Sequence, residues 1–562
     1  QAQPIRPTLL PLKTTPLRLL AVCLFLLNLA RAAVPPPAPF TAKELAQGFI
    51  DTAVIAKPRA AYRTTIDAAE VRAGMTVRRT FKQLDNLRVL RVPPGESVKQ
   101  TLRRLRDTGL YDYVEPDRIL RARLAPDDPS FGSQWSLHNL TEIGTDIGAP
   151  AAWDIRHDAP DVVVAVLDSG ARLTHEDLAA NLWSSTDAGH VGTHGIDATG
   201  ENGNIVNYTP NDTDVGHGTH VSGIIGAVGN NGTGIAGVAW KTRLMELRFL
   251  HGADGQGVTS DSIACIDFAI AHGASIINAS YGSDSFSNAE FDAIKRARDA
   301  GIIFVAAAGN GDANNIGFNA DLGNDYPAGY ALDNIVTVAA SRRVDPVSHI
   351  PDTLTAYSNF GSGTVDLAAP GDAIYSTLNT SDHSYGVKSG TSMAAPHVTG
   401  ALALLKAQFP TDTYRQLINR LLRATTKLPA YRGKVQSGGR LNLAGALAST
   451  SNRPFNDDFS ARATLDGTTV TVRSNNIGAT RETVGGEPAH AGFSTATTSL
   501  WWSWTAPDTT QVVFDTSGSS YDTVLAIYQG SSLSALSPVA VNDDAAGATT
   551  SRLLLNVTAG AT

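Results

Sequence analysis

Apolar positions follow different patterns in different parts of the chain. Between residues 127 and 450, short runs that are apolar throughout alternate with stretches whose apolar residues recur at helical spacing. Strands that are apolar on both faces are typical of parallel sheets that helices cover on both sides. We therefore expect an α/β fold with a doubly wound, mainly parallel sheet. The expected strands are residues 162–167, 244–249, 275–278, 302–307, 335–339 and 364–367, and the expected helices are residues 219–227, 260–272, 288–300 and 392–407.

The segment before this region has a mixed pattern. Residues 87–92 alternate as a strand does, and residues 97–108 carry apolar side chains at helical spacing behind Ser97, a residue type favoured at helix N-caps. Residues 111–117 then fit a closing strand. Residues 41–123 are therefore predicted to form a small α+β domain.

The first residues have the pattern of an export signal. Basic side chains precede an apolar run over residues 19–29, and a small-x-small sequence follows it, so residues 1–32 are predicted to be a signal peptide. The run is too short to cross a bilayer comfortably. We therefore expect a secreted, extracellular protein without a permanent membrane anchor.

The pattern changes again after residue 450, where helical spacing disappears and strand-like alternation takes its place. Alternation would put Trp502 and Trp504 on one face of a strand and Trp501 on the other. Core packing explains this spacing, and a binding face for carbohydrate or protein would also fit it. Residues 451–562 are predicted to be a β-sandwich. Its expected strands are residues 469–472, 500–504, 512–515, 523–528 and 553–557.

Charge and cysteine content narrow the class of protein. The net charge of −8 combines a basic segment, residues 1–123 with 21 Lys and Arg against 10 Asp and Glu, with an acidic remainder. An acidic body argues against nucleic-acid binding, and a basic segment in the same chain suggests an intramolecular partner. Cys23 lies in the signal segment and Cys265 in an apolar helical run. A disulfide scaffold is thus excluded, and Cys265 is interpreted as a buried small apolar residue.

Three stretches carry candidate chemistry. Residues 389–398 present Ser392 at the start of an apolar helix, where unpaired N–H groups and the helix dipole would stabilise an oxyanion. A serine needs a base to become a nucleophile, and the base needs a group that orients it. Asp168 ends the apolar run 162–167, and His217 lies in the sequence Gly-His-Gly-Thr-His. The predicted roles are nucleophile for Ser392, general base for His217 and orienting acid for Asp168.

Together these stretches resemble the subtilase family of serine endopeptidases, with Asp, His and Ser in that family's chain order over residues 127–450. The resemblance implies peptide-bond hydrolysis of protein substrates through an acyl-enzyme, with no cofactor for catalysis. Residues 41–123 resemble the family's inhibitory propeptide, which implies a self-processing zymogen cleaved within residues 121–128. Residues 501–507 and 521–528 resemble the bacterial pre-peptidase C-terminal domain, which is expected to be incomplete because the chain stops before that family's last strands.

The resemblance also implies further site residues. Asn310 matches the family's oxyanion-hole amide. The family's substrate-binding segments match Ser280, Tyr281 and Gly282 on one side and Ala307, Ala308 and Gly309 on the other. Their small side chains favour a bulky apolar residue before the cleaved bond. The sequence Tyr-Pro-Ala at residues 326–328 resembles a family segment with a cis proline.

Calcium is the one metal that the resemblance implies. Asp177 and Asn231 match family ligands of a structural calcium ion, and oxygen donors on a Gly-rich loop suit such a hard cation. His220 is interpreted as structural support, since no third zinc ligand has suitable spacing. The acidic residues of the loop before His217 are interpreted as solvated charges in preference to a second ion site: Asp197, Glu201, Asp212 and Asp214.

Two other functions remain open from the sequence. A catalytically inactive subtilase could serve as a binding scaffold, although Asp168, His217, Asn310 and Ser392 are all present. Alternatively, the protein is an exported adhesin whose C-terminal domain carries the binding function. An exopeptidase is disfavoured, because nothing in the sequence indicates that one end of the substrate site is blocked.

Overall fold

The computed structural model describes residues 49–119, 125–139, 144–200, 203–343, 352–482, 486–488, 497–545 and 547–562. The predicted signal peptide with Cys23 lies outside these residues, as does part of the predicted cleavage segment. The chain divides into two units, residues 1–122 and 123–562, and each is described by itself. No helix of the described residues is long and apolar enough to cross a membrane.

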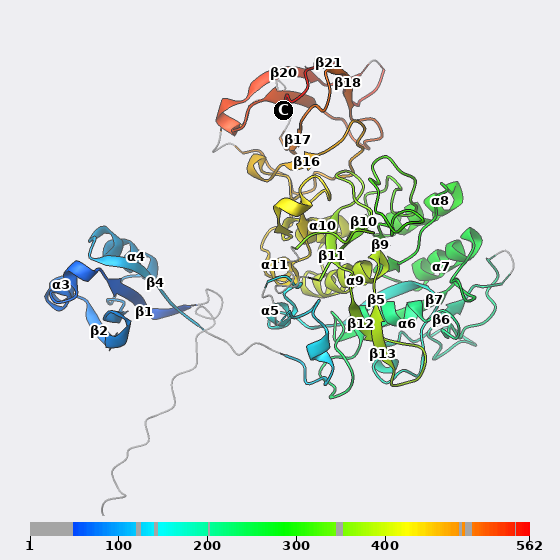
Figure 1. Ribbon diagram of the computed structural model, residues 1–562, viewed down its shortest axis with the longest axis horizontal. Coiled ribbons are helices and arrows are strands. Elements are labelled where there is room, and N and C mark those ends of the chain that lie inside the picture. The colour runs from blue at the N-terminus through cyan, green and yellow to red at the C-terminus, as the bar shows by residue number, and fades with distance from the viewer. Residues whose placement is uncertain are drawn as a thin grey trace, which may run out of the picture. The chain divides into compact units, whose positions relative to one another are not determined.

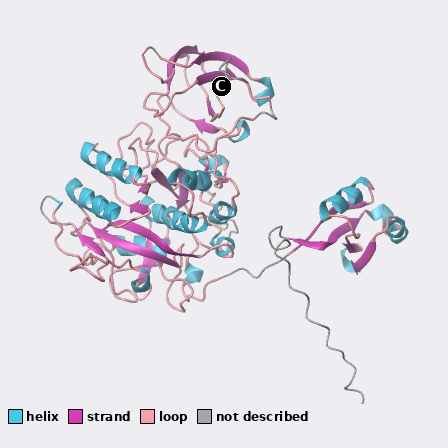
Figure 2. Cartoon of the chain, turned by 180° about the vertical axis from the view of Figure 1, so that it is seen from behind, coloured by secondary structure: helices cyan, strands magenta, loops and turns pink. Residues whose placement is uncertain are grey.

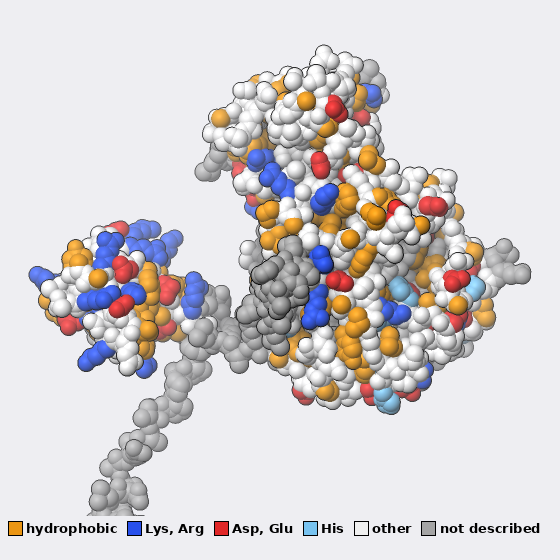
Figure 3. All heavy atoms as spheres, in the orientation of Figure 1, with side chains coloured by type: hydrophobic (Ala, Val, Ile, Leu, Met, Phe, Trp, Pro, Cys, Tyr) orange, Lys and Arg blue, Asp and Glu red, His pale blue; other side chains and the backbone are white. Residues whose placement is uncertain are grey.

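The first unit is a small α+β domain built on an antiparallel four-stranded sheet. The predicted helix over residues 97–108 is present as α4 (Val98–Asp107), and Ser97 caps it by accepting a hydrogen bond from the Gln100 N–H. The Lys and Arg side chains stand out on this unit in Figure 3. Its strand order is β2-β3-β1-β4, with β1 (Phe49–Pro58), β2 (Thr76–Phe81), β3 (Leu87–Arg91) and β4 (Tyr111–Arg118), and α3 (Ile66–Arg72) is its second helix.

The second unit is built on a nine-stranded sheet that is parallel except at one edge (Figure 1). Only the terminal strand β14 pairs antiparallel to its neighbour among the described strands. The order is β14-β15-β11-β10-β9-β8-β5-β7-β6, with β14 (Thr426–Lys427), β15 (Gly439–Arg440), β11 (Leu367–Pro370), β10 (Ile335–Ser341), β9 (Ile303–Ala307), β8 (Ile276–Ala279), β5 (Asp158–Asp168), β7 (Lys241–Arg248) and β6 (Gly195–Asp197).

Helices cover both faces of this sheet, which explains why its strands are apolar throughout (Figure 2). Val164 and Val166 of β5 pack in the core that contains α6 (His217–Gly226) and α9 (Thr391–Gln408). The alternate residues Ala165 and Leu167 pack in the core on the other face, with α7 (Thr259–Ala271) and α8 (Asn288–Asp299). The predicted doubly wound α/β fold is confirmed. The remaining elements of this region are α5 (Ala149–Trp153), β12 (Ile374–Thr377), β13 (Tyr385–Lys388), α10 (Tyr414–Arg423) and α11 (Leu443–Ala448).

Cys265 lies on α7 with no exposed surface, as predicted for a small apolar residue. Burial raises the pKa of its thiol well above the usual range, so the thiol stays protonated. Its sulfur also lies 3.9 Å from the Arg248 carbonyl oxygen, consistent with a weak S–H donor. Cys265 is therefore a packing residue.

The tail consists of short strands in two-stranded pairs, which fits the predicted β-sandwich class. One predicted strand, residues 469–472, is wrong: these residues form no strand. They run across the α/β body, where a Cβ on Gly363 would come within 2.3 Å of the Thr471 carbonyl oxygen. The tail strands are β16 (Ala463–Leu465) paired with β17 (Trp502–Trp504), β18 (Thr510–Asp515) with β21 (Arg552–Val557), and β19 (Leu525–Gln529) with β20 (Ser537–Asn542).

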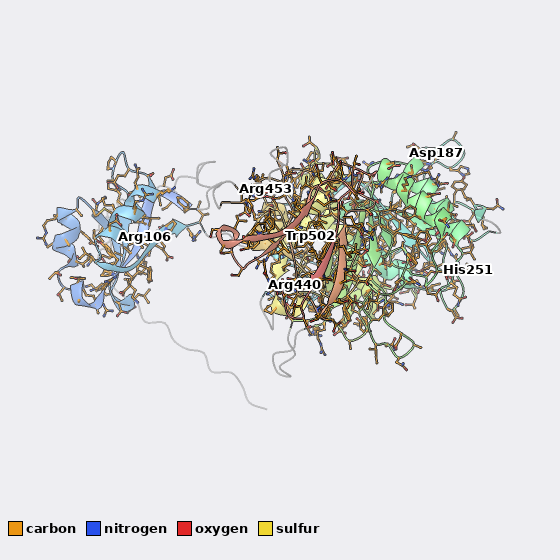
Figure 4. The ribbon with its side chains drawn as sticks, turned by 90° about the horizontal axis from the view of Figure 1, so that it is seen from above. Arg106, Asp187, His251, Arg440, Arg453 and Trp502 are labelled. Carbon is orange, nitrogen blue, oxygen red and sulfur yellow. The ribbon has the colours of Figure 1, made fainter. Side chains whose placement is uncertain are left out.

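The first part of the tail is joined to the body by polar contacts. The side chain of Arg473 is only 9% exposed and lies 3.8 Å from the Asp366 carboxylate, just before β11. Its guanidinium donates to the Tyr330 carbonyl at 2.7 Å and to Thr337 Oγ1 at 3.2 Å. Arg453 and Trp502, labelled in Figure 4, belong to the same part of the tail. Removing this part would therefore leave buried polar groups of the body without partners.

Candidate active site

Asp168 and His217 lie side by side where strand β5 ends and helix α6 begins. Asp168 is the last residue of β5 and has no exposed surface, while His217 is the first residue of α6. His217 Nδ1 lies 2.8 and 3.0 Å from the two carboxylate oxygens of Asp168. Burial by itself lowers the pKa of His217, but the charge and hydrogen bond of Asp168 outweigh burial and raise that pKa.

The glycine after His217 allows this approach of helix and strand. A Cβ at Gly218 would come within 2.2 Å of the Gly170 carbonyl oxygen and 3.1 Å of the Asp168 Cβ. The Gly218 N–H donates to Ser169 Oγ, and the Ser169 N–H donates to the Asp168 carboxylate at 2.8 Å. Only a residue without a side chain fits between α6 and the end of β5.

Asp212 supports the same helix, a role that the sequence analysis missed. It is 2% exposed, and its carboxylate accepts from the N–H groups of Gly216 and Thr219 and from the Thr219 hydroxyl. Asp212 therefore caps the N-terminus of α6 from the preceding loop. Because the residue stands five positions before His217 and not directly at the helix start, sequence spacing gave no sign of the cap.

The interpretation of the loop acids as solvated charges is wrong for two of the four. Asp212 is buried as a helix cap, and Asp197 is 5% exposed and lies 3.7 Å from Arg248. Asp214 also pairs with Arg248, at 3.2 Å. Glu201 lies outside the described residues. The loop acids thus hold the structure around α6, which composition alone could not reveal.

Ser392 lies in the first turn of α9, at the carboxyl ends of the central strands. Its hydroxyl donates to the Ser280 carbonyl at 3.1 Å, and the Ser280 hydroxyl donates back to the Ser392 carbonyl at 3.0 Å. Ser280 directly follows β8, the parallel neighbour of β5, with Ala279 in register with Leu167. The serine motif is therefore at the same sheet edge as Asp168, although no hydrogen bond joins Ser392 to His217 among the described residues.

Asn310 is tied to the start of the same helix. Its Oδ1 accepts from the Thr391 N–H at 2.8 Å and from the Thr391 hydroxyl at 2.9 Å. These contacts use the carbonyl oxygen of the Asn310 side-chain amide, although the residue as a whole is exposed. Within the described residues Nδ2 makes no hydrogen bond, so this N–H₂ group is available beside Ser392.

The two expected substrate segments lie at the carboxyl ends of neighbouring strands, β8 and β9. Tyr281 is anchored by its hydroxyl, which donates to Glu290 at 3.0 Å, while Gly282 is exposed. Ala307 and Ala308 are buried, and the Gly309 backbone has a φ of +96° that favours glycine. The peptide bond between residues 326 and 327 is cis.

His220 joins separate elements of the structure. It is fully buried, and its Nε2 lies 3.1 Å from the Ile374 carbonyl and 3.2 Å from the Gly386 carbonyl. Burial lowers the pKa of His220 to about 3, so the ring is neutral and donates from Nε2. It joins α6 to the β12–β13 pair, in agreement with the prediction.

The two calcium ligands expected from the sequence come from separate segments of the chain and lie together with a further acid. Asn231 Nδ2 donates to Asp177 at 2.9 Å, and Asp128 accepts from the N–H groups of Asn230 and Asn231. Asp177 has no exposed surface and Asp128 is 4% exposed, and neither pairs with Lys or Arg in the described part of the chain. Burial raises the pKa of both carboxyls, that of Asp177 to about 6. Two buried acids without a counter-cation fit a divalent cation.

Known proteins are similar to this chain in sequence. The model of the subtilase family matches residues 159–446. An extracellular protease of Xanthomonas campestris pv. campestris is 32% identical over 444 residues, which are 73% of this chain and 72% of the relative. A thermophilic serine proteinase of a Bacillus species is 35% identical over 56% of this chain and 67% of its own. Thermitase of Thermoactinomyces vulgaris is 37% identical over 50% of this chain and 86% of its own. The chain therefore belongs to the subtilase family and is a serine-type endopeptidase.

Proposed function

We propose that this secreted endopeptidase cleaves protein substrates with Ser392, His217 and Asp168 as its catalytic triad. The observation that carries the proposal is the hydrogen bond between the buried Asp168 and the partly exposed His217, at the same strand ends where Ser392 lies in the first turn of α9. An extracellular protease among the relatives supports secretion. The proposal includes synthesis as a zymogen, with residues 41–123 as intramolecular inhibitor.

The mechanism follows from the chemistry of each group. Ser392 Oγ attacks the carbonyl carbon while His217 Nε2 takes its proton, and Asp168 holds the imidazole through Nδ1 and stabilises the imidazolium. The oxyanion accepts hydrogen bonds from the Ser392 N–H and from Asn310 Nδ2. His217 then protonates the leaving amine, and an acyl-enzyme remains on Ser392. Water, activated by the neutral His217, hydrolyses this ester and restores the serine.

Peptide substrates are proposed to add as a strand beside residues 280–282, with residues 307–309 opposite. The exposed Gly282 suits this role, because its backbone makes no hydrogen bond within the part of the chain that the structure describes, and edge groups without a partner strand can bind an extended peptide. The cleaved carbonyl would then lie near both Ser392 and Asn310. This arrangement needs both segments held rigidly, which the Tyr281–Glu290 hydrogen bond provides on one side.

Calcium is proposed as a structural ion, held by Asp177 and Asn231 with Asp128 as a further ligand. The ion would neutralise the buried carboxylates and take no part in the reaction. We expect chelation to lower the unfolding temperature and added calcium to restore it, because a ligand that binds only the folded state stabilises that state by about 2.7 kcal/mol at 100 times its Kd. Asp177→Asn should remove the calcium dependence. An unfolding temperature that ignores both chelator and calcium would contradict this site.

The test of the triad compares the wild type with Ser392→Ala, using chain mass, N-terminal sequence and hydrolysis of denatured casein. We expect the wild type to shed about 120 residues, in line with a propeptide of roughly domain size, and to digest casein. Ser392→Ala should remain full length and lose about 10⁶-fold in turnover. Ser532→Ala, an exposed serine of the tail, is the matched control and should behave as the wild type.

Three other outcomes would have definite meanings. A Ser392→Ala variant that still digests casein would contradict the nucleophile. A wild type that stays intact and inert would favour an inactive scaffold. If a variant that ends at residue 504 loses particle binding and keeps casein hydrolysis, the C-terminal domain carries an adhesive function.

A further inference from the structure

Asp325 places a carboxylate between the two proposed substrate segments. A Cβ on Gly282 would come within 2.8 Å of Asp325 Oδ1, and a Cβ on Gly309 would come within 2.0 Å of Asp325 Oδ2. The carboxylate therefore touches the backbone of one glycine on each side. Both contacts depend on the absence of a side chain, so the two segments leave space that this acid occupies.

The carboxylate has one polar partner among the described residues. Asn359 Nδ2 donates to Oδ2 at 3.0 Å, whereas Oδ1 accepts no hydrogen bond and no Lys or Arg pairs with the acid. Asn359 is itself fully buried, and its own Oδ1 accepts from the Phe318 N–H. The fixed amide therefore holds one oxygen of Asp325 and leaves the other for a ligand.

The electrostatic setting of Asp325 is that of an acid without a counter-charge. Burial and the nearby Asp284 raise the pKa of Asp325 to about 7, against the lowering effect of the Asn359 hydrogen bond. Asp284 comes from the loop after β8 and is the charged group that faces Asp325 within the described residues. The groups from the other side, Gly309 and Asn359, are uncharged. A cation between these acids would relieve both the repulsion and the cost of burial.

We propose that Asp325 determines specificity by selecting a Lys or Arg side chain before the cleaved bond. This inference rests on the proposed function, since it assumes that residues 280–282 and 307–309 bind substrate. It replaces the expectation of a bulky apolar residue, which considered only the small side chains of the two segments. A guanidinium or ammonium group would donate to Oδ1 of Asp325.

The test uses four tetrapeptide p-nitroanilides that differ only in the last residue: Arg, Lys, Phe and citrulline. Citrulline has nearly the shape of Arg without its charge, so the Arg/citrulline ratio of kcat/KM isolates the charge. We expect this ratio to be roughly 10- to 100-fold in the wild type, the range of a hydrogen bond to a charged group. Asp325→Asn should bring the ratio close to one, mainly by lowering kcat/KM for Arg and Lys.

The ratio should also rise with pH between about 6 and 8, as Asp325 ionises. Titration of His217 changes kcat/KM for the Arg and citrulline substrates by the same factor, so it cancels in the Arg/citrulline ratio. Asp161→Asn is the matched control, because it removes the same charge at a side chain that is 94% exposed on β5. This variant should keep the wild-type ratio.

Inhibition of the wild type by benzamidine, an aromatic cation, gives a measure that does not depend on a variant folding. We expect benzamidine to compete with the Arg substrate in the wild type. As a separate comparison, it should bind the folded Asp325→Asn variant at least tenfold more weakly. A wild type that cleaves the Phe substrate fastest, with an Arg/citrulline ratio near one, would overturn the inference and leave the triad intact. A wild type that cleaves none of the four and resists labelling by a serine-directed sulfonyl fluoride would overturn the proposed function, and with it this inference.

Discussion

A buried acid lies beside a basic group at each of the two strand ends of the nine-stranded sheet, the carboxyl edge and the amino edge. The two pairs differ in what the basic group does. At the carboxyl edge, Asp168 holds His217 at 2.8 Å, and the ring remains within reach of solvent. At the amino edge, Asp366 precedes β11 and lies 3.8 Å from Arg473, which the tail supplies. Both acids are buried, at 0% and 4% exposure. The difference lies in what surrounds each basic group.

The guanidinium of Arg473 forms its hydrogen bonds with groups of the protein itself. Its two terminal nitrogens donate to the carbonyls of Ala328, Tyr330 and Thr364 and to the Thr337 hydroxyl, so four of the five N–H groups of the guanidinium are engaged within the protein. His217 leaves Nε2 without a protein partner among the described residues and can exchange a proton there. We therefore expect the buried acid to serve catalysis where its partner His217 keeps a ring nitrogen free, and to serve stability where its partner Arg473 is held by the protein.

The largest expected effect is at the carboxyl edge. We expect Asp168→Asn to lower kcat/KM about 10⁴-fold, or about 5 kcal/mol in the activation barrier, because the imidazole loses its orientation and its stabilising charge. Urea unfolding of this variant should change little, since Asn keeps the shape of the side chain. Steady-state kinetics and urea titration of the same preparation measure both.

The pH dependence sharpens this prediction. Because Asp168 raises the pKa of His217, the neutral base is lost as pH falls through that raised pKa, and kcat/KM falls with it. In Asp168→Asn the pKa of His217 should drop, and the acid limb of the residual kcat/KM should move to lower pH. An unchanged acid limb would show that another group controls it.

The second effect is at the amino edge and should reverse the pattern. We expect Arg473→Met to lower the free energy of unfolding by about 3–5 kcal/mol, because Asp366 stays buried without its counter-charge. The folded fraction should keep kcat/KM within about threefold of the wild type, since the triad lies at the other edge. Thermal unfolding and active-site titration separate the two quantities.

The double variant Arg473→Met with Asp366→Asn is the control for this reading. Burial raises the pKa of Asp366 to about 6 even with Arg473 present, so removing the acid should recover part of the lost stability. If the double variant is no more stable than the single one, the loss comes from packing and the carbonyl contacts.

The smallest effect concerns the helix that carries His217. We expect Asp212→Ala to cost about 1–2 kcal/mol of unfolding free energy, the range for a lost helix cap, and to lower kcat moderately through misplacement of His217. Asp212→Asn keeps one acceptor and should be milder in both. Equal stability of wild type and Asp212→Ala would contradict the cap.

Local sequence was a good guide where an element's own residues decide its structure. The apolar runs around β5 and β9 and the cap at Ser97 appear as expected, because period and capping act over a few residues. Residues 469–472 have the composition of a strand, yet they follow the surface that Arg473 anchors. The Arg473 carbonyl directly after them accepts from the Gln436 side chain, and residues 469–472 pair with no strand of the described chain.

Sequence alone determined the α/β class, the subtilase motifs and the residues offered for catalysis, because these depend on periodicity and on short, ordered spacings. Tertiary structure alone decided which charges are buried and beside what. Asp212 became a helix cap and Asp325 came to lie between Gly282 and Gly309 through contacts between segments far apart in the chain. Burial and charge pairing depend on all the segments that surround a residue, and no local pattern records them.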